Sequence, residues 1–302
     1  GIRCWGVTGV QTCALPICET RELLSHPTEE YTKRLLAVRS LREERSQQAS
    51  DAVVLKVDRV TGRYPNADQD VLEGVSVEVE RGKTVGLVGE AGSGKSTLAR
   101  VITGLLPPTQ GQVSYKGEIL SADLRNRGKE DLRRIQMIYQ MPDVALNPRQ
   151  RVRDVIGRPL EFYLSMRGKE KAARVAELLE QIELPVDFEE RYPAQLSGGE
   201  KQRVCIARAL AAEPDLIICD EVTSALDQLV AEGILELLQR LQNELGVSYL
   251  FITHDLATVK AIADDIVVMY QGKIVEQGPK QEILTPPQDR KSTRLNSSHT
   301  SI

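Results

Sequence analysis

The stretch Gly89–Thr97 constrains the fold of this chain more than any other feature. It follows the pattern G-x-x-x-x-G-K-[ST] and lies between a short apolar run, Thr84–Val88, and a segment of helical character, Leu98–Ile102. Glycine leaves backbone N–H groups free to turn towards an anion, and the positive end of the following helix dipole faces the same point. We therefore predict a phosphate-binding loop between a buried parallel strand and a helix, with a plain Gly-rich turn as the alternative.

The loop predicts a nucleotide site with a divalent cation. Lys95 would reach the β- and γ-phosphates, and the Ser96 hydroxyl would ligate Mg²⁺. The residues that we expect to contact the nucleotide here are Gly89, Gly92, Ser93, Gly94, Lys95, Ser96 and Thr97.

Composition narrows the classes of function. The 302 residues are 41% hydrophobic and 27% charged, an ordinary balance for a soluble chain. A net charge of −4 gives no basic footprint, so nucleic acid is disfavoured as a partner. No apolar run approaches the roughly 18 residues of a membrane span, so a membrane role would need partner subunits. Of five cysteines, only Cys205 and Cys219 lie in segments with the pattern of a buried core, which indicates a reducing compartment. The spacing of the cysteines does not match that of a metal site.

The two ends of the sequence look unlike the rest. Residues 1–18 and 288–302 resemble the two strands of a translated sequencing adapter, and we interpret both as extraneous tails. A signal peptide is rejected because polar residues interrupt the N-terminal apolar run. Residues 19–50 show helical periodicity followed by a charged linker. Within them Glu22–Pro27 resembles Glu282–Pro287, either by chance or as an internal repeat.

From residue 51 onward, the periodicity predicts a mixed α/β fold. Alternating residues indicate an antiparallel sheet, and apolar runs indicate buried strands. The expected strands are Val53–Val57, Val75–Glu80, Thr84–Val88, Gln112–Tyr115, Ile135–Tyr139, Leu216–Cys219 and Ser248–Thr253. Apolar residues at helical spacing from Arg151 to about Leu184 indicate an inserted helical subdomain, at about 151–210. Tyr64, in the loop after the first strand, is either a packing residue or an aromatic that stacks on a nucleobase.

A second anion site is predicted at Leu196–Glu200. Ser197 is a natural N-cap, and Glu200 occupies the capping-box position three residues later. This pattern alone indicates only a well-capped helix. Gly198 and Gly199, however, present bare amides at the helix N-terminus, which favours a second contact with phosphate.

Polar residues directly follow two of the apolar strands. Asp220 and Glu221 end the run Leu216–Cys219, and His254 ends Ser248–Thr253. Chemistry gathers at the carboxyl ends of strands in open α/β sheets. We expect Asp220 to hold the Mg²⁺ bound by Ser96, Glu221 to orient or deprotonate water, and His254 to contact the γ-phosphate and that water.

Taken in order, these motifs resemble the ATP-binding cassette (ABC) ATPases over residues 51–287. The resemblance implies a P-loop NTPase with a mixed central sheet, an antiparallel β subdomain and an inserted helical subdomain, and ATP and Mg²⁺ as cofactors. The matching positions are Gly89–Ser96 (Walker A), Gln140 (Q-loop), Leu196–Glu200 (signature), Leu216–Asp220 (Walker B), Glu221 (catalytic glutamate), Ser224–Asp227 (D-loop), His254 (switch histidine) and Tyr64 (base stacking).

The resemblance also distributes roles among these residues. It implies that Glu221, His254, Gln140 and Lys95 act in catalysis, and that Ser96, Gln140 and Asp220 hold the metal. The implied nucleotide contacts beyond the phosphate loop are Tyr64, Ser197, Gly198, Gly199 and Asp227. Two positions depart from the family pattern: Val222 stands where Pro usually follows the glutamate, which puts the rate in doubt, and Glu200 stands where Gln is common.

Within the family, three stretches look like the dipeptide, oligopeptide and nickel importer branch. They are Ala145–Arg149, Arg191–Gln195 and Met269–Glu276. This branch implies an ATPase on the cytoplasmic face of a prokaryotic membrane, most directly for di- or oligopeptide import. Residues 19–50 resemble the tail of such a domain plus a linker, so we expect a fragment of a tandem protein.

The resemblance further implies partners. A second ATPase domain would pair head to tail, two permease subunits would span the membrane and contact the region from Gln140 to Arg153, and an extracytoplasmic solute-binding protein would act indirectly. The alternatives are a nickel or other small-solute importer of this branch, a soluble ABC ATPase of translation or DNA repair, and a regulatory nucleotide-binding module. The transported solute cannot be predicted from this chain.

Overall fold

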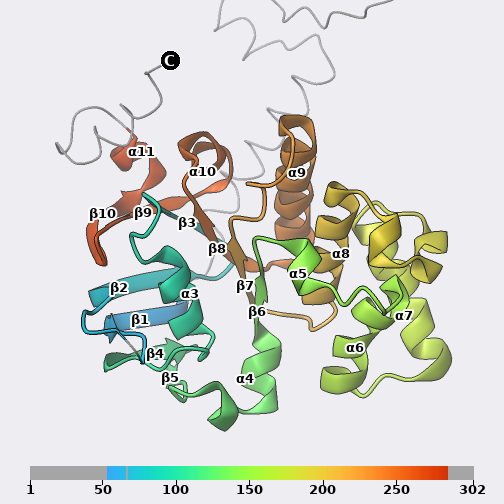
Figure 1. Ribbon diagram of the computed structural model, residues 1–302, viewed down its shortest axis with the longest axis horizontal. Helices are drawn as coiled ribbons and strands as arrows, with labels where there is room; N and C mark the ends of the chain where they lie inside the picture. Colours follow the sequence, from blue (N-terminus) through green and yellow to red (C-terminus); the bar gives the residue numbers. More distant parts are fainter. Residues whose placement is uncertain (1–52, 66, 285–302) are drawn as a thin grey trace, which may run out of the picture. The chain divides into compact units, whose positions relative to one another are not determined.

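The structure is a computed structural model that describes residues 53–65 and 67–284. Its centre is a six-stranded sheet in the order β10-β9-β3-β8-β7-β6, in which β10 alone runs antiparallel to its neighbour. The strands are β3 (Thr84–Gly89), β6 (Ile135–Ile138), β7 (Leu216–Asp220), β8 (Ser248–Thr253), β9 (Asp265–Tyr270) and β10 (Lys273–Pro279). The predicted mixed central sheet is therefore confirmed (Figure 1).

A second sheet of four antiparallel strands has the order β2-β1-β4-β5. Its strands are β1 (Val53–Gly62), β2 (Leu72–Glu80), β4 (Gln110–Tyr115) and β5 (Glu118–Ile119). Alternate apolar residues of β1 and β2 point into the core, as their sequence pattern predicts. The antiparallel β subdomain is confirmed, with β1 and β2 longer than predicted.

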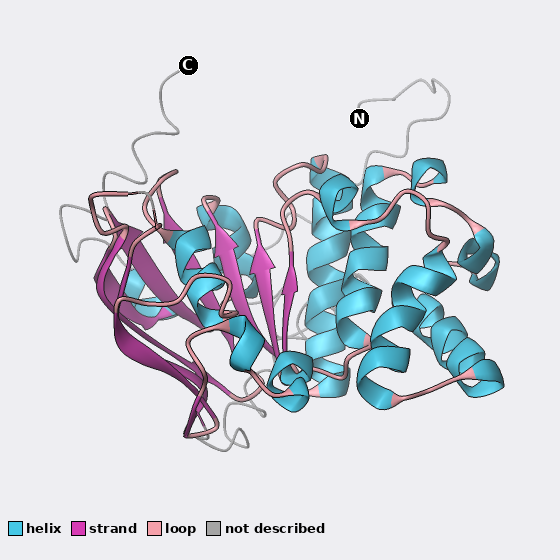
Figure 2. Ribbon diagram, turned by 60° about the horizontal axis from the view of Figure 1, so that its bottom comes forward, coloured by secondary structure: helices cyan, strands magenta, loops and turns pink. Residues whose placement is uncertain are grey.

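Helices complete the unit on both sides of the parallel strands, with the larger group on one side (Figure 2). They are α3 (Lys95–Ile102), α4 (Lys129–Arg134), α5 (Pro142–Ala145), α6 (Val152–Leu164), α7 (Gly168–Gln181), α8 (Gly198–Leu210), α9 (Gln228–Leu245), α10 (Leu256–Ile262) and α11 (Lys280–Ile283). The predicted continuous helical segment 151–184 is wrong in one respect. Ser165 adopts a left-handed conformation (φ 60°) that ends α6, so the segment folds as two helices.

The central sheet is buried on both faces. On β7, Ile217 and Cys219 pack with the helices α6–α9, whereas Leu216 and Ile218 pack with α3 and the antiparallel sheet. A strand that is buried on both faces needs a continuous apolar run, which is why Leu216–Cys219 contains no polar residue. This burial fixes the register of the strands, and thereby the positions of the residues that follow them.

Several expectations concern other parts of the chain. The β9–β10 hairpin was not predicted, although Gln271 and Gly272 form the turn between the two strands. The tails 1–18 and 288–302 and the segment 19–50 lie outside the described residues, and the domain boundaries remain predictions. Among residues 53–65 and 67–284, no helix has the length and apolar character needed to cross a membrane.

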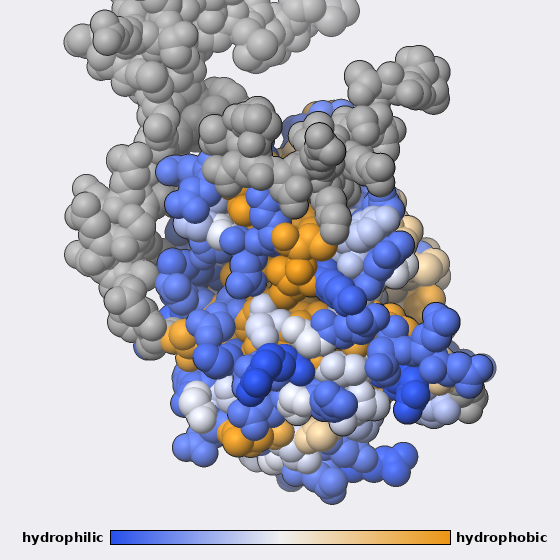
Figure 3. All heavy atoms as spheres, turned by 90° about the vertical axis from the view of Figure 1, so that its left-hand side faces the viewer, coloured by the Kyte–Doolittle hydropathy of each residue, from blue (hydrophilic) through white to orange (hydrophobic). Residues whose placement is uncertain are grey.

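The face at the left of Figure 1 is largely hydrophilic, with small apolar patches (Figure 3).

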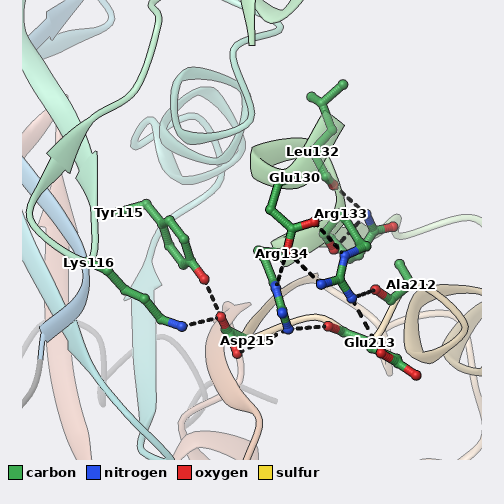
Figure 4. A network of polar contacts seen from close by, with 10 residues as sticks. Tyr115, Lys116, Glu130, Leu132, Arg133, Arg134, Ala212, Glu213 and Asp215 are labelled. Carbon is green, nitrogen blue, oxygen red and sulfur yellow. Dashed lines mark hydrogen bonds and ion pairs between the residues drawn. The ribbon is translucent and has the colours of Figure 1, made fainter. Parts of the chain in front are cut away.

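A polar network joins the antiparallel sheet to the start of β7, at the end opposite to the phosphate loop (Figure 4). Asp215, just before β7, accepts hydrogen bonds from the Tyr115 hydroxyl and from Lys116 Nζ, the latter at 2.6 Å. Arg134 adds an ion pair at 3.7 Å. Burial opposes ionisation of Asp215, but the hydrogen bonds from Lys116 and Tyr115 outweigh it and hold the pKa of this carboxyl below its usual value.

We predict that Asp215→Asn lowers the free energy of unfolding by about 1–3 kcal/mol at pH 7, because it removes charged hydrogen bonds at a part-buried site. The folded pKa lies below the unfolded value of about 3.9, so this contribution is present above the unfolded value and is lost as the pH falls through the folded pKa. Urea unfolding at pH 7 and at successively lower pH below about 3.9 measures this loss. Asp187→Asn, which alters an exposed ion pair, is the control and should change stability by less than about 0.5 kcal/mol. An equal loss in both variants would contradict the prediction.

Candidate active site

The phosphate loop lies between the end of β3 and the start of α3, as predicted. Lys95 is the first residue of α3 and is only 5% exposed. Its ammonium group donates to the carbonyl oxygens of Gly89 and Glu90, both at 2.8 Å, and lies 3.4 Å from the Ser93 hydroxyl. Desolvation lowers the pKa of Lys95, against the opposing attraction of Glu221 and Asp220. The positive charge is therefore held inside the loop, next to the carboxylates of β7.

Two glycines of the loop need conformations or space that other residues lack. Gly94 has φ +105°, and a Cβ on it would lie 2.9 Å from Leu72 Cδ2 and 3.1 Å from the carbonyl oxygen of Val71. A Cβ on Gly89 would lie 2.3 Å from the carbonyl oxygen of Met269. The backbone of the loop therefore fits closely against its neighbours, in the shape that amide groups need to converge on phosphate.

Ser96 and Asp220 meet at the predicted metal position. The Ser96 hydroxyl donates to Asp220 Oδ1 at 3.1 Å, and Asp220 is the buried last residue of β7. Burial raises the pKa of Asp220, while the Ser96 hydrogen bond opposes that rise. A hydroxyl and a carboxylate are hard oxygen ligands that suit Mg²⁺. Among the described residues no three His, Cys, Asp or Glu side chains form a metal cluster, so a cation here would also need Gln140 or phosphate oxygens.

Glu221 sits in a strained turn and has partners on both carboxylate oxygens. Its φ is +50°, a left-handed value that is uncommon outside glycine. Oε2 accepts from Gln140 Nε2 at 2.8 Å, and Oε1 lies 3.3 Å from His254 Nδ1. The Ser224 hydroxyl donates to the Glu221 carbonyl oxygen at 2.9 Å, and its backbone N–H bonds the same oxygen at 3.1 Å. The turn is thus closed by Ser224 and aims the carboxylate between Gln140 and His254.

Sheet topology explains why these residues meet. The neighbours β3, β8, β7 and β6 are parallel, so their carboxyl ends lie at one edge of the sheet. The phosphate loop follows β3, His254 follows β8, Asp220 and Glu221 end β7, and Gln140 follows β6. The structure therefore brings together residues that are up to about 170 positions apart in the sequence.

Tyr64 lies beside the same helix but has polar partners. Its hydroxyl is 3.3 Å from Thr97 Oγ1 and accepts from Arg100 Nη1 at 3.0 Å. The Arg100 guanidinium lies 5.8 Å from the centre of the ring. The ring is half-buried against the core of the antiparallel sheet. These contacts position Tyr64 at the edge of the phosphate loop, and its base-stacking role stays a prediction.

The predicted second anion site lies apart from the first. Strands β6 and β7 separate α3 from α8 (Figure 1). Ser197 caps α8 by accepting from the Glu200 N–H at 3.3 Å, and the Glu200 carboxylate accepts from the Ser197 N–H at 2.7 Å. Asp227 caps α9 by accepting from the Val230 N–H at 3.1 Å. Among the residues that the structure describes, no hydrogen bond joins Ser197, Gly198, Gly199 or Asp227 to the phosphate loop.

Sequence reasoning missed two groups that shape this site. Ser224 was assigned only to the D-loop, although a serine three residues after Glu221 is a recognisable turn-closing signal. Val222, flagged as a departure, is 2% exposed and packs in the core beside α8 and α9. Its side chain anchors the turn by burial. The backbone at Met269 also lies close to Gly89 and limits the space at the loop. This contact follows from the β3–β9 pairing and has no local sequence signal.

A family model described as ABC transporter matches residues 72–224. The chain belongs to this family and is an ATPase, in the branch of peptide and nickel import ATP-binding proteins. It is 44% identical over 230 residues to a putative peptide import ATP-binding protein of Brucella abortus, covering 75% of this chain and 69% of that protein. Nickel import ATP-binding protein NikE of Escherichia coli is 44% identical over 217 residues, with 72% of this chain and 81% of NikE covered.

Solved structures agree with this assignment. The chain superimposes on cbiO1 from Clostridium perfringens, part of the ABC transporter complex cbiONQ, with a TM-score of 0.70 and 28% identity, covering 77% of this chain and 90% of cbiO1. It also matches the ATP-binding cassette MJ0796, solved as a dimeric post-hydrolysis state with ADP and Pi. That match has a TM-score of 0.66 and 31% identity, and covers 74% of this chain and 98% of MJ0796. The predicted P-loop NTPase fold is confirmed.

We predict that Gly94→Ala weakens ATP binding at least about tenfold, because a Cβ at φ +105° is strained and would press on Leu72 and Val71. Titration with a fluorescent ATP analogue measures the affinity. Gly74→Ala is the matched control, because Gly74 also has positive φ (+61°) but has nothing within 4 Å of its Cβ position and lies outside the loop. Equal weakening by both variants would show that general strain, not the loop geometry, governs binding.

Proposed function

We propose that this chain is the ATP-hydrolysing subunit of a membrane importer, most directly one for di- or oligopeptides. The observation that carries the proposal is the convergence of Lys95, the Ser96–Asp220 pair and the Gln140–Glu221–His254 group at one edge of the central sheet. Relatives named for peptide, dipeptide and oligopeptide transport support the substrate class.

The site residues divide the work of phosphoryl transfer. The loop amides and Lys95 bind the β- and γ-phosphates, and Ser96, Gln140 and Asp220 hold Mg²⁺, which neutralises the developing phosphate charge. Glu221 orients the attacking water and accepts its proton, and its position is set by the hydrogen bond from Gln140 and the contact with His254. Catalysis then depends mostly on positioning and electrostatics, which a preformed cluster supplies.

A second ATPase domain completes the site. The chain's own signature, Ser197–Gly199, lies on the other side of β6 and β7 from its own phosphate loop (Figure 1). In a head-to-tail pair, the signature of each domain lies over the ATP that is bound by the other domain. This arrangement accounts for the two separate anion sites of one chain. The dimeric state of MJ0796 supports this arrangement. The partner is either the first domain of a tandem protein, whose tail would be residues 19–50, or a separate copy.

A groove beside the Q-loop suits the permease subunits. It contains a cavity of about 290 Å³, lined in part by Leu105, Tyr139, Ala145 and Arg208. Leu105 (48% exposed) and Tyr139 (43%) line the cavity, and three further exposed apolar residues lie within two positions of its lining residues Tyr139, Ala145 and Tyr163: Met141 (56%), Val144 (78%) and Phe162 (57%). Such a cluster marks a docking surface. We place two permease subunits on grooves of this kind, with the chain on the cytoplasmic face of a prokaryotic membrane and the solute-binding protein beyond it.

Three alternatives to this proposal differ in their support. A nickel importer has direct support, because NikE matches this chain as closely in identity as the peptide import relative does. A soluble ABC ATPase or a regulatory module is less favoured, because the apolar groove would have no partner and Glu221 and His254 are both present. Uptake assays with peptides and Ni²⁺ in cells that carry the intact operon separate the two import substrates.

We predict that Glu221→Gln lowers ATP turnover by about 10²–10⁴-fold and leaves ATP affinity unchanged, because it removes the proton acceptor but keeps the side-chain shape. Steady-state ATPase assays and nucleotide titrations, made with the paired partner domain present, measure both. Glu90→Gln, on the exposed rim of the loop, is the control and should keep turnover within about threefold. Near-normal turnover of Glu221→Gln would overturn the role of Glu221.

We also predict that Val144→Glu lowers ATP-driven uptake at least about tenfold in the assembled transporter, because it places a charge among the exposed apolar side chains next to Ala145, which lines the groove. ATP binding by the isolated chain should not change. Ile119→Glu is the matched control: Ile119 is 65% exposed, but it lies on β5, away from the groove. If both variants transport equally well, the groove does not contact the permease.

A further inference from the structure

The two signature glycines have different surroundings, although they are adjacent on the first turn of α8. A Cβ built on Gly199 would lie 2.5 Å from Val230 Cγ1, a separation that real side chains do not adopt. A Cβ on Gly198 would lie 3.6 Å from Leu226 Cδ2, which is ordinary van der Waals contact. Only Gly199 is therefore in direct steric conflict with a side chain at its Cβ position.

Val230 cannot easily move out of the way. It lies in the first turn of α9, and a valine in a helix is nearly confined to one χ1 rotamer. Its backbone N–H is held by the Asp227 carboxylate at 3.1 Å, which fixes the start of the helix. The neighbouring Leu226 packs partly into the core beside α8. The first turns of α8 and α9 are therefore in close contact at Gly199 and Val230.

The backbone conformation at position 199 does not explain why this residue is glycine. Gly199 has no positive φ, in contrast to Gly92 and Gly94, so its dihedral angles are open to any residue. Within a helix, alanine is a better residue than glycine. A substitution at 199 would therefore favour folding if Val230 were absent.

The same contact reaches the catalytic turn. The first turn of α9 follows directly on residues 221–227, in which Ser224 closes the turn at Glu221 and Asp227 caps the helix. Val230 therefore joins the turn that carries Glu221 to the amides of Gly198 and Gly199. In a head-to-tail pair these two groups serve different ATP molecules, one at the chain's own loop and one at the partner's.

We propose that Val230 is a positioning residue for the signature: its contact with Gly199 sets the α8 amides relative to the Glu221 turn, and this contact requires glycine at position 199. The proposal rests on the proposed function, in that the signature covers the ATP of a partner domain. It predicts that substitutions of the two glycines act differently: a side chain at position 199 collides with Val230, whereas a side chain at position 198 meets no packing conflict.

A thermal-unfolding cycle on the full chain tests the packing claim. Gly199→Ala should lower Tm by about 2–6 °C, as overpacking does. Made in a Val230→Ala background, the same substitution should raise Tm, because only the gain in helix propensity remains. Gly198→Ala is the matched control and should leave Tm unchanged or higher. A rise in Tm on Gly199→Ala with Val230 in place, or the same fall in both backgrounds, overturns the proposal.

A second measurement tests positioning. In the Glu221→Gln background, sedimentation with Mg²⁺ and ATP reports head-to-tail pairing. Gly199→Ala should weaken pairing at least about tenfold, and the added Val230→Ala should restore it to within about threefold, since the new methyl group at position 199 then occupies the space of the lost valine methyl group and keeps α8 and α9 in contact. Loss of pairing that Val230→Ala does not rescue overturns the proposal. Failure of the Glu221→Gln parent itself to pair, alone or with its partner domain, counts instead against the proposed function, and the Tm cycle then decides the role of Val230.

Discussion

The parallel pairing of β3, β8 and β7 is the constraint on which the rest of this structure depends. Each strand is buried on both faces, so its register is fixed by apolar packing, and the polar residues that begin β3 and β8, Thr84 and Ser248, are buried with hydrogen-bond partners. The first polar side chains after these strands are therefore delivered to one edge. A buried Lys95 and a buried Asp220 are stable there because each has a hydrogen-bond partner. The position of the site therefore follows from the parallel pairing and the two-sided burial of these strands.

Much of this arrangement can be predicted from sequence, because the relevant signals are local. The phosphate loop has a fixed spacing, and Leu216–Cys219 is a continuous apolar run, so the loop and β7 are found as predicted. The antiparallel strands were predicted too short, because pairing with β4 extends β1 beyond its alternating core. The break at Ser165 was missed, although Gly168, which has a positive φ and begins α7, lies three residues later.

Contacts between distant segments had no such signal. That Gln140 and His254 both reach Glu221 follows from the strand order β8-β7-β6, which a sequence pattern does not specify. The Tyr115–Asp215 contact likewise joins residues 100 positions apart. Val222 is instructive in another way, because its departure from the family pattern concerned the turn, whereas the structure buries its side chain in the core. The cost of the strained Glu221 backbone is thus offset by packing and by Ser224.

Helix α8 links the two surfaces assigned to partners. Its first turn carries Ser197–Gly199, and near its last turn Arg208 donates to the carbonyl oxygen of Ala145 and lines the groove cavity. Thirteen residues of uninterrupted helix make a rod about 20 Å long, with no proline and with no glycine after its first turn to bend it. In the proposed transporter, a displacement at the groove would therefore reach the signature as a rigid-body motion of α8, and ATP bound by a paired domain would act on the other end of the same helix.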